Sequence, residues 1–142
     1  KQSNSRKSVF VPMSADFLHH GHINLLEKAK KYGKVIVGLM TDKGIASYKG
    51  VKPFINYKNR KKIIKQIKLV SKIIPLNGLI YSKIAKKHKF NYVVHGDDWK
   101  RGPQSLERKK LILAMKKWRG KVIEFKYTKG ISSSLVKKKL KF

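Results

Sequence analysis

The sequence predicts an α/β fold, a Rossmann-like parallel sheet with helices on both faces. Short apolar runs alternate along the chain with segments whose apolar residues recur at helical spacing, a pattern typical of parallel strands joined by crossover helices. Hydrophobic residues make up 41% of the 142 residues, enough for the core of one domain. Segments rich in His, Asp, Gly and Ser follow the expected strands, where ligands bind in such sheets.

The first three elements are expected to be a strand, a helix and a strand. Residues 8–13 are rich in apolar side chains and are expected to form a buried strand. Residues 21–32 carry apolar side chains at near-helical spacing, and Gly33 ends the predicted helix. The apolar run 35–40 then predicts the second strand.

The same alternation continues to the end of the chain. Apolar spacing predicts further helices over 57–69, 79–88, 104–119 and 133–140, and further strands over 72–74, 92–95 and 121–125. The polar segments that follow strands are 14–22, 41–52, 96–104 and 127–134. We therefore expect the functional residues in these four segments.

Composition limits the class of protein. Residues 1–7 are expected to be a basic lead-in and residues 8–142 a single domain. Without a run of about 18 apolar residues or a leader segment, neither a membrane span nor a secretory signal is expected. The absence of cysteine excludes disulfides and thiol chemistry, so the cytoplasm is the expected location. The chain starts at Lys1 rather than Met, which fits a piece of a longer protein.

The chain is strongly basic. It has 36 Lys and Arg against 7 Asp and Glu, a formal charge of +29. Such an excess is typical of proteins that bind nucleic acid or anionic surfaces. The lysines are spread along the chain together with much Ile and Asn, which fits a drift in composition equally well. Nucleic acid is therefore expected as a non-specific partner only.

The segment 14–22 is the first candidate site. It places His19 and His22 three residues apart across Gly21, at the mouth of the predicted helix. A helix N-terminus attracts phosphate through its free N–H groups, and two imidazoles could donate to the same oxygens. A metal pair and plain surface histidines are the alternatives.

Two further motifs follow later strands. The sequence 96–99 reads Gly-Asp-Asp-Trp, and its carboxylates could orient a base or hold Mg²⁺ through water. A polar turn that closes a strand is the alternative. The sequence 130–134 reads Gly-Ile-Ser-Ser-Ser and could cap the last helix or hold a phosphate.

Together these motifs resemble the His-x-Gly-His cytidylyltransferase family, which includes glycerol-3-phosphate and choline-phosphate enzymes. The motifs at 19–22, 96–99 and 130–133 occur in the family's order, and the resemblance covers nearly the entire chain. The wording at 11–16, 45–49, 92–100 and 127–128 is closest to the cytidylyltransferase domain associated with phosphoenolpyruvate mutase in phosphonate biosynthesis.

The resemblance implies an enzyme that moves CMP from CTP to a small phosphonate or phosphate and releases pyrophosphate, with Mg²⁺ as cofactor. The implied catalytic residues are His19, His22 and Lys49. Arg60 and Lys129 would contact the acceptor or a phosphate. The implied nucleotide-binding residues are Ser14, Ala15, Asp16, Gly21, Gly96, Asp97, Trp99, Thr128, Ile131, Ser132 and Ser133. No direct metal ligand is identified.

The expected acceptor is a phosphonate such as 2-hydroxyethylphosphonate or 2-aminoethylphosphonate, with the hydroxyl-bearing one favoured. The alternatives are glycerol 3-phosphate and choline phosphate and, less favoured, an adenylyltransferase or a basic nucleic-acid-binding module on this scaffold. One departure concerns the last motif, where Tyr127 and Lys129 replace the arginine and glutamate of the glycerol-phosphate branch. The resemblance also implies a homodimer and a possible fused or partner mutase domain.

Overall fold

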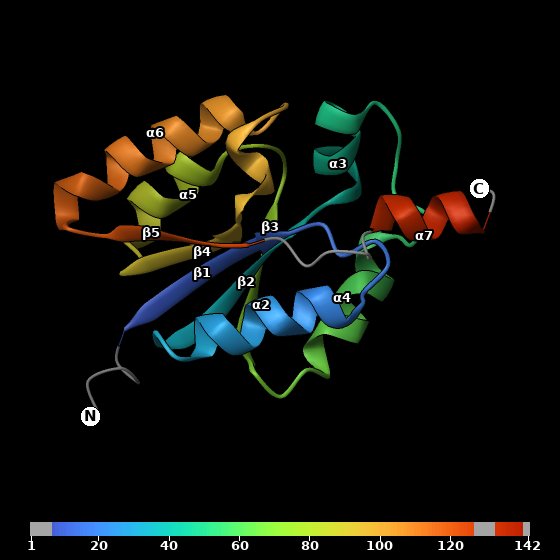
Figure 1. The fold of residues 1–142 in the computed structure, drawn as a ribbon, viewed down its shortest axis with the longest axis horizontal. Helices are drawn as coiled ribbons and strands as arrows, with labels where there is room; N and C mark the ends of the chain where they lie inside the picture. Colours follow the sequence, from blue (N-terminus) through green and yellow to red (C-terminus); the bar gives the residue numbers. More distant parts are fainter. Residues whose placement is uncertain (1–6, 127–132, 141–142) are drawn as a thin grey trace.

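A parallel sheet of five strands forms the centre of the structure, a computed structural model that describes residues 7–126 and 133–140 (Figure 1). The strands lie in the order β3-β2-β1-β4-β5. Their bounds are β1 Ser8–Met13, β2 Lys34–Met40, β3 Val70–Leu76, β4 Tyr92–Gly96 and β5 Lys121–Phe125. The helices are α2 His20–Lys30, α3 Asp42–Lys49, α4 Tyr57–Lys65, α5 Tyr81–His88, α6 Ser105–Met115 and α7 Ser133–Lys139, with 3-10 turns η1 Asp97–Lys100 and η2 Lys116–Trp118.

The order of the strands reverses beside β1. From β1 the chain adds β2 and β3 on one side of the sheet, and β4 and β5 on the other. The β1–β2 ladder runs the full length of β1, from Ser8 opposite Lys34 to Met13 opposite Leu39. Within the described residues the β1–β4 ladder covers only Val9 and Phe10, so it stops before the carboxyl ends of both strands. A crevice is expected at this reversal point.

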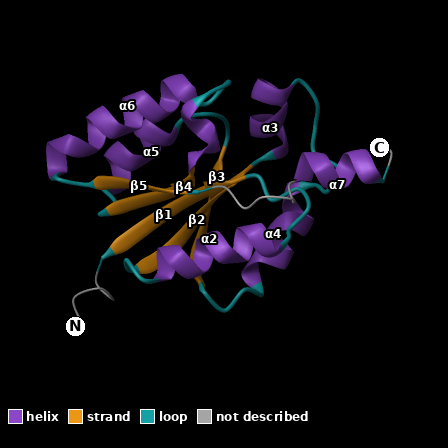
Figure 2. Cartoon of the chain, viewed as in Figure 1, coloured by secondary structure: helices purple, strands orange, loops and turns teal. Residues whose placement is uncertain are grey.

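Successive residues of a strand point to opposite faces of the sheet, and this alternation divides the core in two. Val9, Val11 and Met13 pack in one cluster with side chains of α2 and α4. Phe10 packs in the other cluster with side chains of α3, α5 and α6. Figure 2 shows the corresponding layers, with α5 and α6 on one face of the sheet and α2 and α4 on the other.

The predicted fold class is confirmed, and most predicted elements occur within a few residues of their expected bounds. Where one helix over 104–119 was expected, the structure has α6 followed by the 3-10 turn η2, which ends at Arg119 with a φ of 62°. The largest difference is α3, which lies in a segment expected only as a polar connection. No helix in the described residues is long and apolar enough to cross a membrane. Apart from Lys7, the predicted lead-in lies outside the described residues.

Candidate active site

A cavity of about 410 Å³ opens beyond the carboxyl ends of β1 and β4. Its wall combines the loop after β1, one face of α2, the end of α3, the η1 segment and the end of β5. The lining residues are Pro12, Met13, Ser14, Ala15, His19, Gly21, His22, Asn24, Leu25, Lys28, Tyr48, Lys49, Tyr81, His95, Gly96, Asp98, Trp99, Arg101, Pro103, Gln104, Phe125 and Lys126. The cavity therefore occupies the position where open α/β sheets bind their ligands.

His19 and His22 form the start of α2. His19 is the N-cap, and its Nδ1 accepts a hydrogen bond from the Gly21 N–H at 3.1 Å. The His19 N–H donates in turn to Nδ1 of His22, also at 3.1 Å. This reciprocal arrangement is a capping box in which imidazoles replace the usual hydroxyl and carboxyl groups. The two rings lie with their centroids 4.1 Å apart, and both line the cavity.

These hydrogen bonds fix the protonation of both rings. An imidazole whose Nδ1 accepts a hydrogen bond carries its proton on Nε2. Burial lowers the pKa of His22 to about 4, with a further lowering from His19. Burial and His20 also lower the pKa of His19. Near neutral pH the helix start therefore presents two neutral N–H donors whose orientation is set by the backbone.

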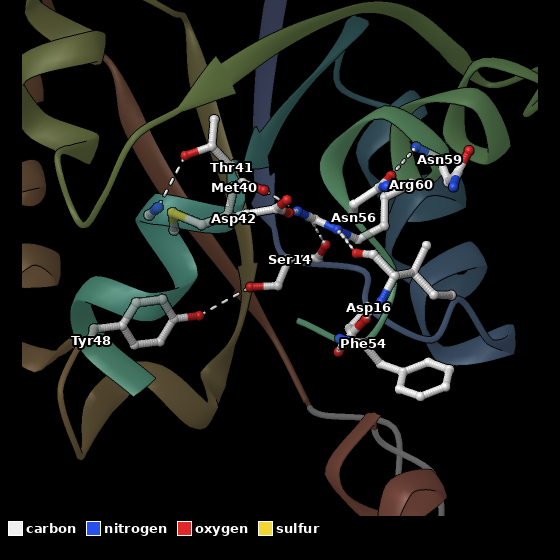
Figure 3. Close-up of polar contacts among 12 residues, drawn as sticks. Ser14, Asp16, Met40, Thr41, Asp42, Tyr48, Phe54, Asn56, Asn59 and Arg60 are labelled. Carbon is white, nitrogen blue, oxygen red and sulfur yellow. Dashed lines mark hydrogen bonds and ion pairs between the residues drawn. The ribbon is translucent and has the colours of Figure 1, made fainter. Parts of the chain in front are cut away.

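The end of α3 forms a second part of the wall. Tyr48 and Lys49 both line the cavity, and Lys49 Nζ lies 5.8 Å from the centroid of the Tyr48 ring. The Tyr48 hydroxyl is hydrogen-bonded to Ser14 Oγ at 3.0 Å (Figure 3). The α3 helix thus brings an ammonium group to the loop that leads into the histidine pair.

The third part of the wall is the end of β4. The ring of His95 stacks on Trp99 with centroids 3.8 Å apart, and Nδ1 of His95 lies 2.8 Å from the Gly96 carbonyl oxygen. Trp99 is only 1% exposed, and its indole N–H donates to Glu124. Arg108 holds the same carboxylate at 2.6 Å. Burial lowers the pKa of His95, so its ring is a neutral, fixed surface of the cavity.

Many of the predicted site residues lie together in this wall. They are Ser14, Ala15, His19, Gly21, His22, Lys49, Gly96 and Trp99. The predicted residues Thr128, Lys129, Ile131 and Ser132 lie outside the described residues, and Ser133 is described only as the first residue of α7. Asp16, Asp97 and Arg60 are not among the lining residues.

Arg60, which was expected to contact the acceptor or the triphosphate, lies inside the protein. It is 1% exposed, and its guanidinium donates to the carbonyl oxygens of Ser14, Met40 and Ile55 at 2.6 to 2.8 Å (Figure 3). Its Nη2 also lies 2.7 Å from the Asp42 carboxylate. The side chain connects backbone segments inside the protein. Its contact with the acceptor or the triphosphate stays a prediction.

Asp16 and Asp97, which were expected to bind the nucleotide, lie beside the cavity wall in the sequence but are not among its lining residues, and their predicted role stays a prediction. Asp16 is 2% exposed, and its two carboxylate oxygens accept the N–H groups of Phe54 and Ile55 at 2.9 and 2.8 Å. It therefore ties the loop after β1 to the segment before α4. Asp97 begins η1, and the acidic side chain that reaches the cavity wall is its neighbour Asp98.

Sequence reasoning missed several wall residues. His95 lies inside the segment 92–100, where Gly96, Asp97 and Trp99 were expected to bind the nucleotide. Asp98 was expected only as one of two carboxylates that could orient a base or hold Mg²⁺. Tyr48 directly precedes Lys49, which was expected in the site. Lys28 could have been found from helical spacing, because it lies seven residues after Gly21 and therefore on the same face of α2.

The residues present suit Mg²⁺ only together with a substrate. Within the described part of the chain no group of three or more His, Asp or Glu could hold a metal ion. Among the described wall residues Asp98 is the acidic one. Mg²⁺ is commonly bound by one or two carboxylates together with substrate phosphates and water. Asp98 fits this donor set.

Comparison with known proteins identifies the class. The cytidylyltransferase-like family matches residues 11–139, and the chain belongs to this family. It is 32% identical over 136 residues to glycerol-3-phosphate cytidylyltransferase of Staphylococcus aureus, covering 94% of this chain and 95% of that protein. It is 40% identical over 97 residues to the Bacillus spizizenii protein of the same name, covering 66% of this chain and 74% of that protein.

Two further similarities are to a curated relative and to a solved structure. Ethanolamine-phosphate cytidylyltransferase of Arabidopsis thaliana is 30% identical over 137 residues, which cover 91% of this chain and 31% of that protein. A lipopolysaccharide core biosynthesis protein of Thermoplasma volcanium shares the fold with a TM-score of 0.72 at 22% identity, over 86% of this chain and 98% of that one. The chain is a cytidylyltransferase, a nucleotidyltransferase enzyme. The acceptors in the names of these relatives, glycerol 3-phosphate and ethanolamine phosphate, are phosphate esters.

Proposed function

We propose that this enzyme transfers CMP from CTP to glycerol 3-phosphate and releases pyrophosphate. The observation that carries the proposal is the similarity to the Staphylococcus aureus glycerol-3-phosphate enzyme, which extends over nearly the whole of both chains. It replaces the phosphonate acceptor that the closer wording of the sequence suggested. The expected homodimer, cytoplasmic location and associated mutase domain stay predictions.

The charge of the cavity supports an acceptor without a cation of its own. Among its described residues the wall carries the cationic side chains of Lys28, Lys49, Arg101 and Lys126 and the single carboxylate of Asp98. A net positive cavity attracts a phosphate dianion, and it disfavours an acceptor that carries an ammonium group. Glycerol 3-phosphate therefore fits this wall better than ethanolamine phosphate or choline phosphate.

The proposed reaction needs alignment more than proton transfer. An oxygen of the acceptor phosphate, already an anion near neutral pH, attacks the α-phosphorus of CTP. The bond from this phosphorus to the bridging oxygen of the β-phosphate breaks, and pyrophosphate leaves with that electron pair. Phosphoryl-type transfers of this kind depend mainly on positioning and on charge stabilisation. No general base and no covalent enzyme intermediate are required.

The protein residues supply that positioning. The Nε2–H groups of His19 and His22 donate to triphosphate oxygens, and their neutral state avoids the cost of burying two charges. Lys49 adds a positive charge from the end of α3. Mg²⁺ carried on the triphosphate would neutralise part of its charge, with Asp98 and water as ligands.

Product analysis tests the proposal. The protein is incubated with Mg²⁺, CTP or ATP, and one acceptor from a panel: glycerol 3-phosphate, ethanolamine phosphate, choline phosphate, 2-hydroxyethylphosphonate or 2-aminoethylphosphonate. Phosphorus NMR of the product and pyrophosphate release report turnover. We expect CTP and glycerol 3-phosphate to give the highest kcat/KM. Conversion of a phosphonate with refusal of glycerol 3-phosphate would reject this acceptor and restore the phosphonate hypothesis.

A further inference from the structure

We infer that Tyr48 is a positioning residue that holds the Lys49 end of α3 against the loop after β1. This inference rests on the proposed function only for the role of Lys49 as a phosphate contact. Tyr48 connects two parts of the cavity wall that belong to different elements, the last turn of α3 and the loop residue Ser14.

The first half of α3 is fixed without help from Tyr48. Thr41 caps the helix by accepting the Gly44 N–H at 3.0 Å, and its own N–H donates to the Leu76 carbonyl at 2.8 Å. Ile45 is 2% exposed in the core. A Cβ added at Gly44 would lie 2.7 Å from the Leu76 carbonyl oxygen, which shows how closely the helix backbone approaches the end of β3.

The last turn of α3 is much less enclosed. Ser47, Lys49 and Gly50 are exposed, whereas Tyr48 is half-buried. The helix ends at Gly50 with φ 81°, and a Cβ added there would meet no atom within 4 Å. The hydrogen bond between Tyr48 and Ser14 connects this exposed turn to the loop after β1, which leads to His19. Because Lys49 Nζ lies near the Tyr48 ring, displacement of the ring would displace the ammonium group as well.

Ser14 is a rigid partner for this hydrogen bond. Its carbonyl oxygen accepts from Nη1 of the buried Arg60 at 2.8 Å, and the same nitrogen donates to Met40 at the end of β2. Figure 3 shows the chain of contacts from Arg60 through Ser14 to Tyr48. Arg60 thus holds the loop from inside the protein. Through its hydrogen bond to this loop, Tyr48 fixes the exposed end of α3.

The test is a double-mutant cycle with the single variants Tyr48→Phe and Ser14→Ala and the double variant. Phenylalanine keeps the ring and removes only the hydroxyl. We expect Tyr48→Phe to lower kcat/KM about 3- to 10-fold, the effect typical of removing one neutral hydrogen bond. In a Ser14→Ala background the same change should have little further effect on kcat/KM, because the hydrogen bond is already absent. The same holds in a Lys49→Ala background, because the ammonium group that Tyr48 positions is absent.

Two controls distinguish positioning from other roles. Tyr57→Phe removes the hydroxyl of a tyrosine outside the cavity wall, and we expect it to leave kcat/KM unchanged. Hydrogen exchange of the amides of 46–50 gives a readout that needs no turnover. Exchange there should become faster in Tyr48→Phe and in Ser14→Ala but not in Tyr57→Phe, while all three variants stay folded and their thermal unfolding midpoints shift by no more than about a few degrees.

The outcomes separate this inference from the proposed function. If no acceptor is converted but exchange at 46–50 responds as expected, the positioning role of Tyr48 stands and the proposed function fails. If Tyr48→Phe lowers kcat/KM equally with and without the Ser14 hydroxyl, the phenol acts on the substrate directly and the inference is overturned. Unchanged exchange and unchanged kcat/KM in both single variants would overturn it too.

Discussion

At the scale of single residues, His19 and His22 each use the two ring nitrogens for different tasks. Nδ1 accepts a backbone N–H, whereas Nε2 carries a proton that is available to a ligand. We expect His19→Ala and His22→Ala each to lower kcat about 100- to 1000-fold, the typical cost of removing one preorganised donor to a transition-state oxygen. Steady-state kinetics with CTP measures the effect.

The substitution His19→Asn distinguishes the catalytic role of His19 from its role as the N-cap of α2. The Asn side chain is a good N-cap acceptor, so His19→Asn should keep the stability that His19→Ala loses, about 1 kcal/mol. Both variants should nevertheless show the same fall in kcat, because both lack the Nε2–H donor. His88→Ala, at an exposed histidine outside the cavity wall, is the matched control and should leave turnover unchanged. Near-normal turnover in His19→Asn would show that the Nε2–H group is not used.

The lowered pKa of His22 makes stability depend on pH. The folded value is about 4 and an unperturbed histidine titrates near 6.5, so the unfolded chain binds more protons between these values. The stabilisation is therefore fully present above about pH 6.5 and is lost as pH falls toward 4. Urea unfolding at several pH values should show a smaller decline below pH 6.5 in His22→Gln than in the parent. An equal decline in both would contradict the assigned protonation.

The position of the histidine pair at the cavity could be predicted from the sequence, but the burial of Arg60 could not. The histidines could be predicted because glycine, helix start and strand end coincide at 14–22. Arginine is almost never fully buried, so nothing local indicates that Arg60 lies inside. Its burial depends on the carbonyl oxygen of the nearby Ile55 and on partners from segments remote in sequence, the carbonyl oxygens of Ser14 and Met40 and the Asp42 carboxylate.

At the scale of elements, Arg60 connects the carboxyl ends of β1 and β2 with the segment before α4. Removing its side chain leaves buried carbonyl oxygens and Asp42 without their donor. We expect Arg60→Ala to lower the free energy of unfolding by about 2 to 4 kcal/mol, because several buried carbonyl oxygens lose their donor, whereas Asp42 is 35% exposed and can be solvated. Urea denaturation measures this change.

Lys61 is a suitable control for Arg60, because it is the next residue of α4 and is exposed. Lys61→Ala should change the free energy of unfolding by less than about 0.5 kcal/mol. Arg60→Lys should recover only part of the stability, since an ammonium group cannot donate in the planar pattern of a guanidinium. If Arg60→Ala were as stable as the parent and yet inactive, a direct substrate contact would be the correct role after all.

The α3 helix shows where pattern recognition fails for an element. It has eight residues, a glycine near its start and one core residue, Ile45, so no apolar period is visible in the sequence. Its position depends on backbone contact between Gly44 and the end of β3, a tertiary interaction. The other helices and the strands could be predicted because their apolar residues recur at the spacing of helical turns or strand pleats.

At the scale of the whole molecule, the order of the strands determines where the cavity lies, and the protein around the cavity is strongly basic. Alternating strands and helices predict a parallel sheet, but the reversal between β1 and β4 depends on the packing order of the strands. The +29 charge is also a property of the whole chain. Most of its lysines lie outside the cavity wall, where Lys28, Lys49 and Lys126 are the lysines among the described residues.

Surface charge and catalysis should therefore be separable. Lys86, Lys87, Lys116 and Lys117 are exposed and lie outside the cavity wall. With the four changed to Gln, we expect CTP turnover to stay within a few fold at 0.15 M salt, where charges more than about 8 Å apart are largely screened. Non-specific binding to duplex DNA should weaken, and the slope of log affinity against log salt should fall by about 0.9 for each phosphate that the variant no longer neutralises. A collapse of turnover in the folded variant would show instead that the basic surface takes part in the reaction, for example by drawing CTP toward the cavity.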